Sequence, residues 1–123
     1  MYTYLGGCHC EAVRFKVRVE AKSALLCNCS ICSMSGHIHL IVCLEDFELI
    51  RGSDVLVTYA FNTMVAQHTF CGVCGIKSFY TPRSHPHGVS VNLRCLDDVK
   101  LCDFTTRDFD GAHWEDHIDT IRD

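Results

Sequence analysis

The chain has 123 residues, of which 48% are apolar and ten are cysteines, and its formal net charge is −4. This length suits one domain with a modest core, and we expect residues 1–123 to form a single domain. Acidic and basic residues are interspersed with a slight acidic excess, so we expect neither nucleic acid nor an anionic membrane as a partner. The chain has no apolar run of about 18 residues, so we expect no membrane span.

Alternation of apolar and polar side chains predicts a series of short β-strands. The clearest is 13–19, where apolar residues alternate with basic ones. Further short strands are predicted over residues 37–42, 47–49, 55–61, 67–70, 77–80 and 89–93. A turn at 51–54 and a loop at 82–88 interrupt them, and apolar residues at helical spacing over 114–121 predict one short C-terminal helix. The pattern therefore predicts a mainly β fold.

Several apolar side chains are expected in the core rather than at a ligand site. Aromatic residues more often pack than stack on a ligand, and isolated cysteines behave as small apolar residues. The residues expected in the core on these grounds are Tyr59, Phe70, Phe79, Tyr80, Trp114, Cys43, Cys95 and Cys102.

Seven of the ten cysteines fall into three short groups. The groups are Cys8 with Cys10, Cys27 with Cys29 and Cys32, and Cys71 with Cys74. Disulfides are the first alternative to metal, but the two cysteines of a C-x-C pair are too close for an unstrained bridge. The N-terminal segment also lacks the charged start and apolar run of a secretory signal. We therefore expect a reduced zinc protein in the cytoplasm, or in the nucleus if the source is eukaryotic.

The spacing predicts two zinc sites of different kinds. Structural zinc takes four protein ligands, so Cys8 and Cys10 can join Cys71 and Cys74 in a closed four-cysteine cluster. The C-x-x-C-G segment at 71–75 is typical of a zinc knuckle, in which backbone amides point at the sulfurs. The three-cysteine cluster of Cys27, Cys29 and Cys32 then leaves a fourth position, where a substrate thiol would be deprotonated. The alternative is a closed second site, whose fourth ligand is one of Cys43, Cys95, Cys102, His37 and His39.

Together these motifs resemble those of the glutathione-dependent formaldehyde-activating enzymes, a family that includes centromere protein V. The resemblance rests on G-C-H-C at 7–10, C-N-C-S-I-C at 27–32, H-T-F-C-G-V-C-G at 68–75, V-N-L-R-C-L-D at 91–97, and F-D-G at 109–111 with Trp114. Segments 61–63, 66–71 and 78–84 look most similar to the centromere protein V branch.

The resemblance implies the zinc-bound β-tent fold, a structural zinc on the four-cysteine cluster and a catalytic zinc on the three-cysteine cluster. It also implies a reaction, the addition of glutathione or a related thiol to formaldehyde to give S-hydroxymethylglutathione. Run backwards, this is a carbon–sulfur lyase reaction. The alternative function is a non-catalytic zinc-binding module that binds a protein partner, as in centromere protein V, and a third is a chaperone-like or exchange-factor-like role.

The implied reaction needs a proton donor and a cation for the carboxylates of glutathione. The candidate donors are His37, His39 and His68. The candidate cations are Lys77, Arg83 and Arg94. Each of these residues has an alternative role as an ordinary strand or surface residue.

One position departs from the family pattern. Glycine usually follows the first C-x-C pair directly, and here the residue is Glu11. If this position requires a positive φ, glutamate costs of order 1 kcal/mol there. Zinc binding, at about 10 kcal/mol or more for a structural site, outweighs such a cost.

Overall fold

The computed structural model describes residues 1–61 and 63–118. The strands in this part of the chain are β1 (Tyr2–Gly7), β2 (Arg14–Val19), β3 (Ser23–Cys27), β4 (Ile38–Cys43), β5 (Phe47–Arg51), β6 (Leu56–Tyr59), β7 (His68–Cys71), β8 (Phe79–Tyr80), β9 (Gly88–Asn92) and β10 (Thr105–Phe109). The helices are α1 (Ser30–Ser35) and α2 (Trp114–His117), with short 3-10 turns η1 (Leu44–Asp46), η2 (Leu93–Cys95), η3 (Leu101–Asp103) and η4 (Gly111–His113).

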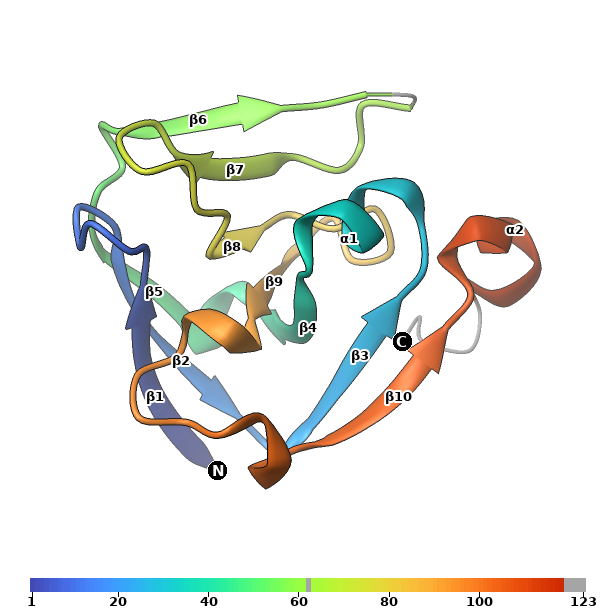
Figure 1. Cartoon of the computed structure of the whole chain (residues 1–123), viewed down its shortest axis with the longest axis horizontal. Helices are drawn as coiled ribbons and strands as arrows, with labels where there is room; N and C mark the ends of the chain where they lie inside the picture. The colour runs from blue at the N-terminus through green and yellow to red at the C-terminus, as the bar shows by residue number, and fades with distance from the viewer. Residues whose placement is uncertain (62, 119–123) are drawn as a thin grey trace.

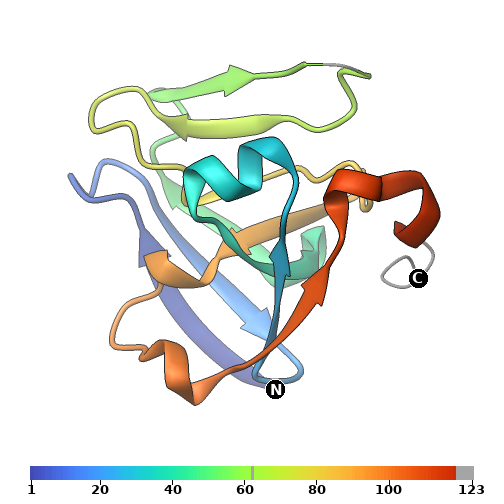
Figure 2. The ribbon, with the colours of Figure 1, turned by 45° about the vertical axis from the view of Figure 1, so that its right-hand side comes forward.

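The strands form three sheets (Figure 1). One contains β1, β2 and β5, a second has the order β10-β3-β4-β9-β8, and the third is the β6–β7 hairpin. In the second sheet β10 runs parallel to β3, so that Phe109 pairs with Cys27. This pairing brings α1 and the segment that follows β10 to the same end of β3, as Figure 2 shows.

The main core lies between the first two sheets. Phe15 and Val17 of β2 are fully buried and belong to one cluster with Leu40 of β4 and Val91 of β9. The alternation that predicts a strand over 13–19 therefore corresponds to a sheet with one buried face and one solvated face. A smaller cluster joins Val13 to two cysteines, Cys8 and Cys71.

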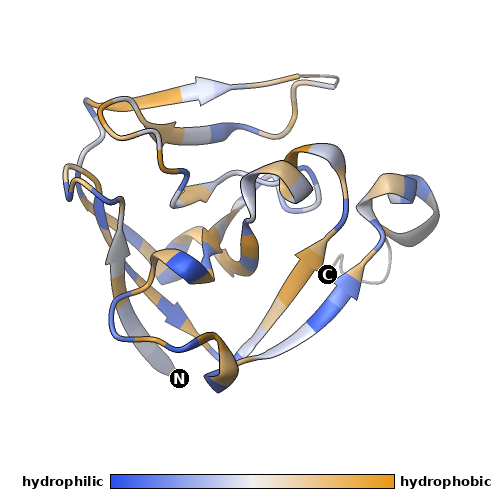
Figure 3. Ribbon diagram, viewed as in Figure 1, coloured by the Kyte–Doolittle hydropathy of each residue, from blue (hydrophilic) through white to orange (hydrophobic). Residues whose placement is uncertain are grey.

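The mainly β fold predicted from the sequence is confirmed, but three strands were missed. β1 and β3 show no sustained alternation, and β10 is an edge strand whose side chains are exposed apart from Phe109. Figure 3 shows the polar β10 beside the apolar β3. Helix α1 was also missed, because Cys32 is its only buried residue and no amphipathic pattern marks it. The predicted C-terminal helix begins at Trp114, and its end lies outside the described residues.

The core position predicted for Tyr59 on the hairpin strand β6 is wrong. Tyr59 is 53% exposed, and Val57 of the same strand is 46% exposed. The reason is that β6 pairs only with β7, in a layer apart from the main core (Figure 1). Cys43 and Cys102, predicted as buried, are also exposed, and Cys95 is half-buried.

Every helix within residues 1–61 and 63–118 is too short or too polar to cross a bilayer.

Candidate functional site

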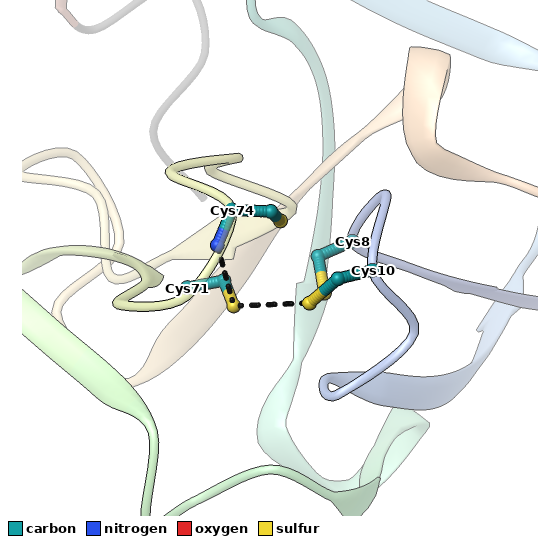
Figure 4. Close-up of side chains that lie close together, drawn as sticks. All are labelled: Cys8, Cys10, Cys71 and Cys74. Atoms are coloured by element: carbon teal, nitrogen blue, oxygen red, sulfur yellow. Dashed lines mark hydrogen bonds between the residues drawn. The ribbon is translucent and has the colours of Figure 1, made fainter.

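The structure brings the four-cysteine cluster together from two distant loops (Figure 4). The four sulfurs lie within 4.8 Å of one another. Cys10 Sγ is 3.6 Å from Cys8 Sγ and 3.7 Å from Cys71 Sγ. Four sulfurs that surround zinc tetrahedrally at about 2.3 Å are separated by about 3.8 Å. The donor type and the spacing therefore fit a tetrahedral zinc ion.

Backbone amides surround these sulfurs as the knuckle motif predicts. Val13 N donates to Cys8 Sγ at 3.3 Å, and Val73 N donates to Cys71 Sγ at the same distance. Gly75 has a φ of 82°, which lets the chain turn back so that its N–H donates to the carbonyl oxygen of Cys71. Such N–H···S bonds stabilise thiolate charge and orient the ligands.

The three-cysteine cluster lies where β3 leads into α1. The sulfurs of Cys27 and Cys32 and one ring nitrogen of His39 lie within 4.8 Å of one another. Interactions with the Cys27 and Cys32 thiols lower the pKa of Cys29, and interactions with the Cys27 and Cys29 thiols raise the pKa of Cys32. The cluster thus combines soft sulfur and nitrogen donors, a set that suits zinc.

The middle residue of the C-N-C segment ties the C-terminal segment to this cluster. Asn28 Nδ2 donates to Asp110 Oδ1 at 2.9 Å, and Ala112 N donates to Asn28 Oδ1 at 2.9 Å. Gly111 then passes so close that a Cβ at this position would lie 2.3 Å from Cys27 Sγ. Position 111 therefore requires a residue without a side chain.

A cavity of about 430 Å³ adjoins the three-cysteine cluster. This volume lies within the range of small-molecule binding sites. Its walls combine the three cysteines with two histidines, aromatic residues, small residues and one arginine. The lining residues used below are Cys27, Cys29, Cys32, His39, His68, Tyr80, Phe61, Phe109, Arg83, Ala112 and Trp114.

A network of buried hydrogen bonds connects His39 and Tyr80 of the cavity wall to Ser90 and His37. Ser90 Oγ lies 2.8 Å from His39 Nδ1 and 3.2 Å from His37 Nε2. Tyr80 OH lies 3.3 Å from His39 Nδ1. Burial lowers the pKa of His39 to about 4 and also lowers the pKa of His37, so both imidazoles are neutral at pH 7. The remaining ring nitrogens, His39 Nε2 and His37 Nδ1, are buried without a hydrogen-bond partner.

Of the three cations predicted to meet a carboxylate, Arg83 lines the cavity. Its guanidinium carbon lies 3.6 Å from the centre of the Trp114 ring. Lys77 instead lies with its Nζ 3.2 Å from His68 Nδ1. Burial lowers the pKa of Lys77, although the nearby thiols oppose this shift. Arg94 is exposed on η2, away from the cavity lining.

Two of the aromatic residues predicted as core line the cavity. Tyr80 is buried, as predicted, and stacks on His68 with 4.7 Å between ring centres. Trp114 is only half-buried and lies under Arg83. Phe79 packs on Phe47, beside the main core, as predicted.

Comparison with known proteins identifies the family of this chain. A family model described as glutathione-dependent formaldehyde-activating enzyme matches residues 3–110. The chain belongs to this family. It is also similar to a crystal structure of a Rhodobacter sphaeroides protein, with 36% sequence identity, a TM-score of 0.75, and coverage of 83% of this chain and 97% of that chain. The family resemblance inferred from the cysteine motifs is thus confirmed.

This member of the formaldehyde-activating family carries a strained backbone beside the four-cysteine cluster. Glu11 has a φ of 66°, so the position does require the left-handed conformation that glycine favours. Its N–H donates to the carbonyl oxygen of Cys8 at 3.2 Å, and its own carbonyl oxygen accepts from Arg51 Nε at 3.0 Å. These bonds hold the loop that presents Cys8 and Cys10.

Other residues of the family pattern have structural roles that the sequence did not reveal. Asn92 Oδ1 accepts from Ile38 N and Arg94 N, which connects β4 to η2. Asp97 forms an ion pair with Arg14. Ser90 was missed altogether, although a serine between the valines of β9 is a signal of a buried hydrogen bond.

Proposed function

We propose that this family member is a zinc-dependent enzyme of the carbon–sulfur lyase type, with structural zinc on the four-cysteine cluster and catalytic zinc on the three-cysteine cluster. It would join glutathione, or a related thiol, to formaldehyde to give S-hydroxymethylglutathione. The observation that carries the proposal is the place of the three-cysteine cluster, which forms part of the wall of a cavity of ligand size.

The proposed reaction is an addition without oxidation or reduction. The S–H bond of the thiol breaks, a C–S bond forms to the formaldehyde carbon, and the carbonyl oxygen gains a proton. A zinc ion on the three cysteines supplies the acidification of the thiol, since a thiol is deprotonated when it binds zinc. The cavity brings the two reactants together, which supplies proximity.

His68 can stabilise the oxygen on which negative charge develops. Lys77 Nζ donates to His68 Nδ1, so we assign the ring hydrogen of His68 to Nε2. Burial lowers the pKa of His68 to about 4, with a further contribution from Lys77, so the ring is neutral at pH 7. A neutral imidazole N–H in the cavity wall is a hydrogen-bond donor for the oxygen of formaldehyde.

Arg83 can bind a carboxylate of glutathione. It is the only lysine or arginine among the described residues that line the cavity. Its position over Trp114 orients the guanidinium plane, and an oriented guanidinium can form two parallel hydrogen bonds with one carboxylate. A neutral thiol of similar size should therefore bind less tightly than glutathione.

The test measures by NMR how fast S-hydroxymethylglutathione exchanges with its components, free glutathione and formaldehyde, in the presence of zinc-loaded protein. We expect acceleration by the native protein and its loss in Cys32→Ser. The matched control is Cys43→Ser, because Cys43 is an exposed cysteine outside both clusters. Acceleration that persists in Cys32→Ser would contradict the proposed role of the three-cysteine cluster.

A second candidate function, a non-catalytic module that binds a protein partner, is favoured by one feature. The β6–β7 hairpin and its loop expose several large apolar side chains: Val57, Tyr59, Phe61, Met64 and Val65. Exposed apolar patches of this kind mark interaction surfaces. A zinc-loaded protein that gives no acceleration in the exchange experiment would favour this second function.

A further inference from the structure

His39 differs in its surroundings from the other histidines whose side chains the structure describes. Its side chain is buried in β4, and one of its ring nitrogens belongs to the group of donor atoms formed with Cys27 and Cys32. Nδ1 is occupied by Ser90 Oγ and Tyr80 OH, whereas Nε2 is buried and has no hydrogen-bond partner. A buried ring nitrogen without a partner costs free energy unless something binds it.

We propose that His39 is the fourth donor of the three-cysteine cluster, through Nε2, so that the metal site at rest is closed by three sulfurs and one nitrogen. Zinc sites of this composition are tetrahedral and need no water or substrate to complete them. Of the other candidates for a fourth ligand, Cys43 is grouped with Glu45 and Asp46, and Cys95 is near Cys8 and Cys74. His37 and Cys102 belong to none of the groups of possible metal ligands found among the described residues.

Ser90 and His37 position the imidazole. The hydroxyl of Ser90 has one hydrogen for two imidazole neighbours, so it must accept from one of them. If His39 Nδ1–H donates to Ser90 Oγ, and the hydroxyl donates to His37 Nε2, then His39 Nε2 carries a lone pair that is available to a metal ion. The reverse order would put a hydrogen on His39 Nε2, where it has no acceptor. A metal ligand of this type is normally held by a hydrogen bond at its other nitrogen.

One consequence rests on the proposed function. A thiol substrate would not enter a vacant position but would have to displace the imidazole of His39. Because His39 also lines the cavity, its released ring would remain beside the bound thiol. Thiol entry would then be governed by how firmly Ser90 holds His39.

The test uses cadmium in place of zinc, observed by cadmium NMR on the full chain. The four-cysteine cluster gives an internal reference resonance, and the three-cysteine cluster gives a second. We expect a scalar coupling between the second cadmium and a nitrogen of His39, and a shift of that resonance alone in His39→Gln. His68→Gln is the matched control, because His68 lines the same cavity outside the donor group and should leave both resonances in place.

The Ser90→Ala variant tests the positioning. It should weaken cadmium binding at the second site about 10- to 100-fold, the usual effect of losing such a supporting bond, and should leave the reference resonance unchanged. Equal weakening at both sites would show a general loss of structure and would overturn the positioning role.

Titration with glutathione separates this inference from the proposed function. If the coupling to His39 is present and disappears as glutathione shifts the second resonance, both stand. A coupling that glutathione does not affect would support His39 as a ligand and contradict thiol binding at the site. A second resonance that responds to glutathione but never shows coupling, and is unchanged in His39→Gln, would overturn the role of His39 and leave the proposed function standing.

Discussion

Glu11 is an unfavourable residue at its position beside the four-cysteine cluster. Its backbone is in the left-handed region, which costs an L-residue roughly 1–2 kcal/mol. Glu11 also adds a carboxylate directly after Cys10 in the chain, and the Cys10 sulfur is anionic when it binds metal. The loop nevertheless keeps its conformation, because the hydrogen bonds of Glu11 and the cluster itself hold it.

Replacing Glu11 by glycine should stabilise the protein. We expect Glu11→Gly to raise the free energy of unfolding by about 1 kcal/mol, since the relief of strain exceeds the extra entropy of glycine in the unfolded chain. The measurement is urea unfolding of the zinc-loaded protein. Glu11→Ala is the matched control: it removes the charge but keeps the strain. If alanine stabilised as much as glycine, charge and not φ would be the cause.

At the scale of elements, β10 and η4 act as a clamp on the three-cysteine cluster. β10 is polar and contributes little to the core, but its parallel pairing with β3 places Asp110 and Gly111 against the C-N-C segment. The amide of Asn28 then joins the two segments, which are 82 residues apart in the sequence. The cavity therefore depends on β10, because the pairing of this strand with β3 positions Asp110 and Gly111 beside the three-cysteine cluster.

Adding one methyl group to this clamp should disturb the three-cysteine cluster selectively. In Gly111→Ala the new Cβ would meet Cys27 Sγ at 2.3 Å and Cys29 Cβ at 3.1 Å, so one of the two segments must move. We expect bound zinc, measured by elemental analysis, to fall from about two ions per chain toward one. Ala112→Ser, whose side chain is exposed, is the control and should keep both ions. A Gly111→Ala protein with unchanged zinc content would show that the contact is tolerated.

At the scale of the whole molecule, the two clusters have different structural roles. The four-cysteine cluster links the loop after β1 to the end of β7, and Cys10 and Cys71 are 61 residues apart. The three-cysteine cluster spans only residues 27–32, together with the neighbouring His39. A link across a long loop restricts the unfolded chain far more than a local one.

The two clusters should therefore differ in their effect on stability. We expect Cys71→Ser to lower the free energy of unfolding by at least about 4 kcal/mol, which is the loop-closure contribution alone of a link of this length. Cys32→Ser should lose one zinc ion with a much smaller effect. Thermal unfolding followed by circular dichroism, with zinc content measured on the same samples, compares the two. Equal destabilisation would mean that both metal sites are structural.

The sequence by itself determined the mainly β class, most strands that face the core, the three cysteine groups and, through their motifs, the family. These features depend on local patterns: alternation in β2, and the fixed short spacing of ligands on one segment. The prediction failed where burial depends on distant partners. Tyr59 has a core-like side chain but is exposed because β6 lies in a two-stranded layer, and Trp114 has a core-like side chain but lines a cavity.

Only the tertiary structure decided which groups meet around the three-cysteine cluster. Asn28, Gly111, Ser90 and His39 come from β3, β10, β9 and β4 or the residues next to them, and no spacing in the sequence relates them. Strand pairing decides their proximity, since the parallel β3–β10 pair brings Gly111 to Cys27 and the antiparallel β4–β9 pair brings Ser90 to His39. The ligand types are thus readable along the chain, whereas the residues that orient those ligands depend on contacts made only after folding.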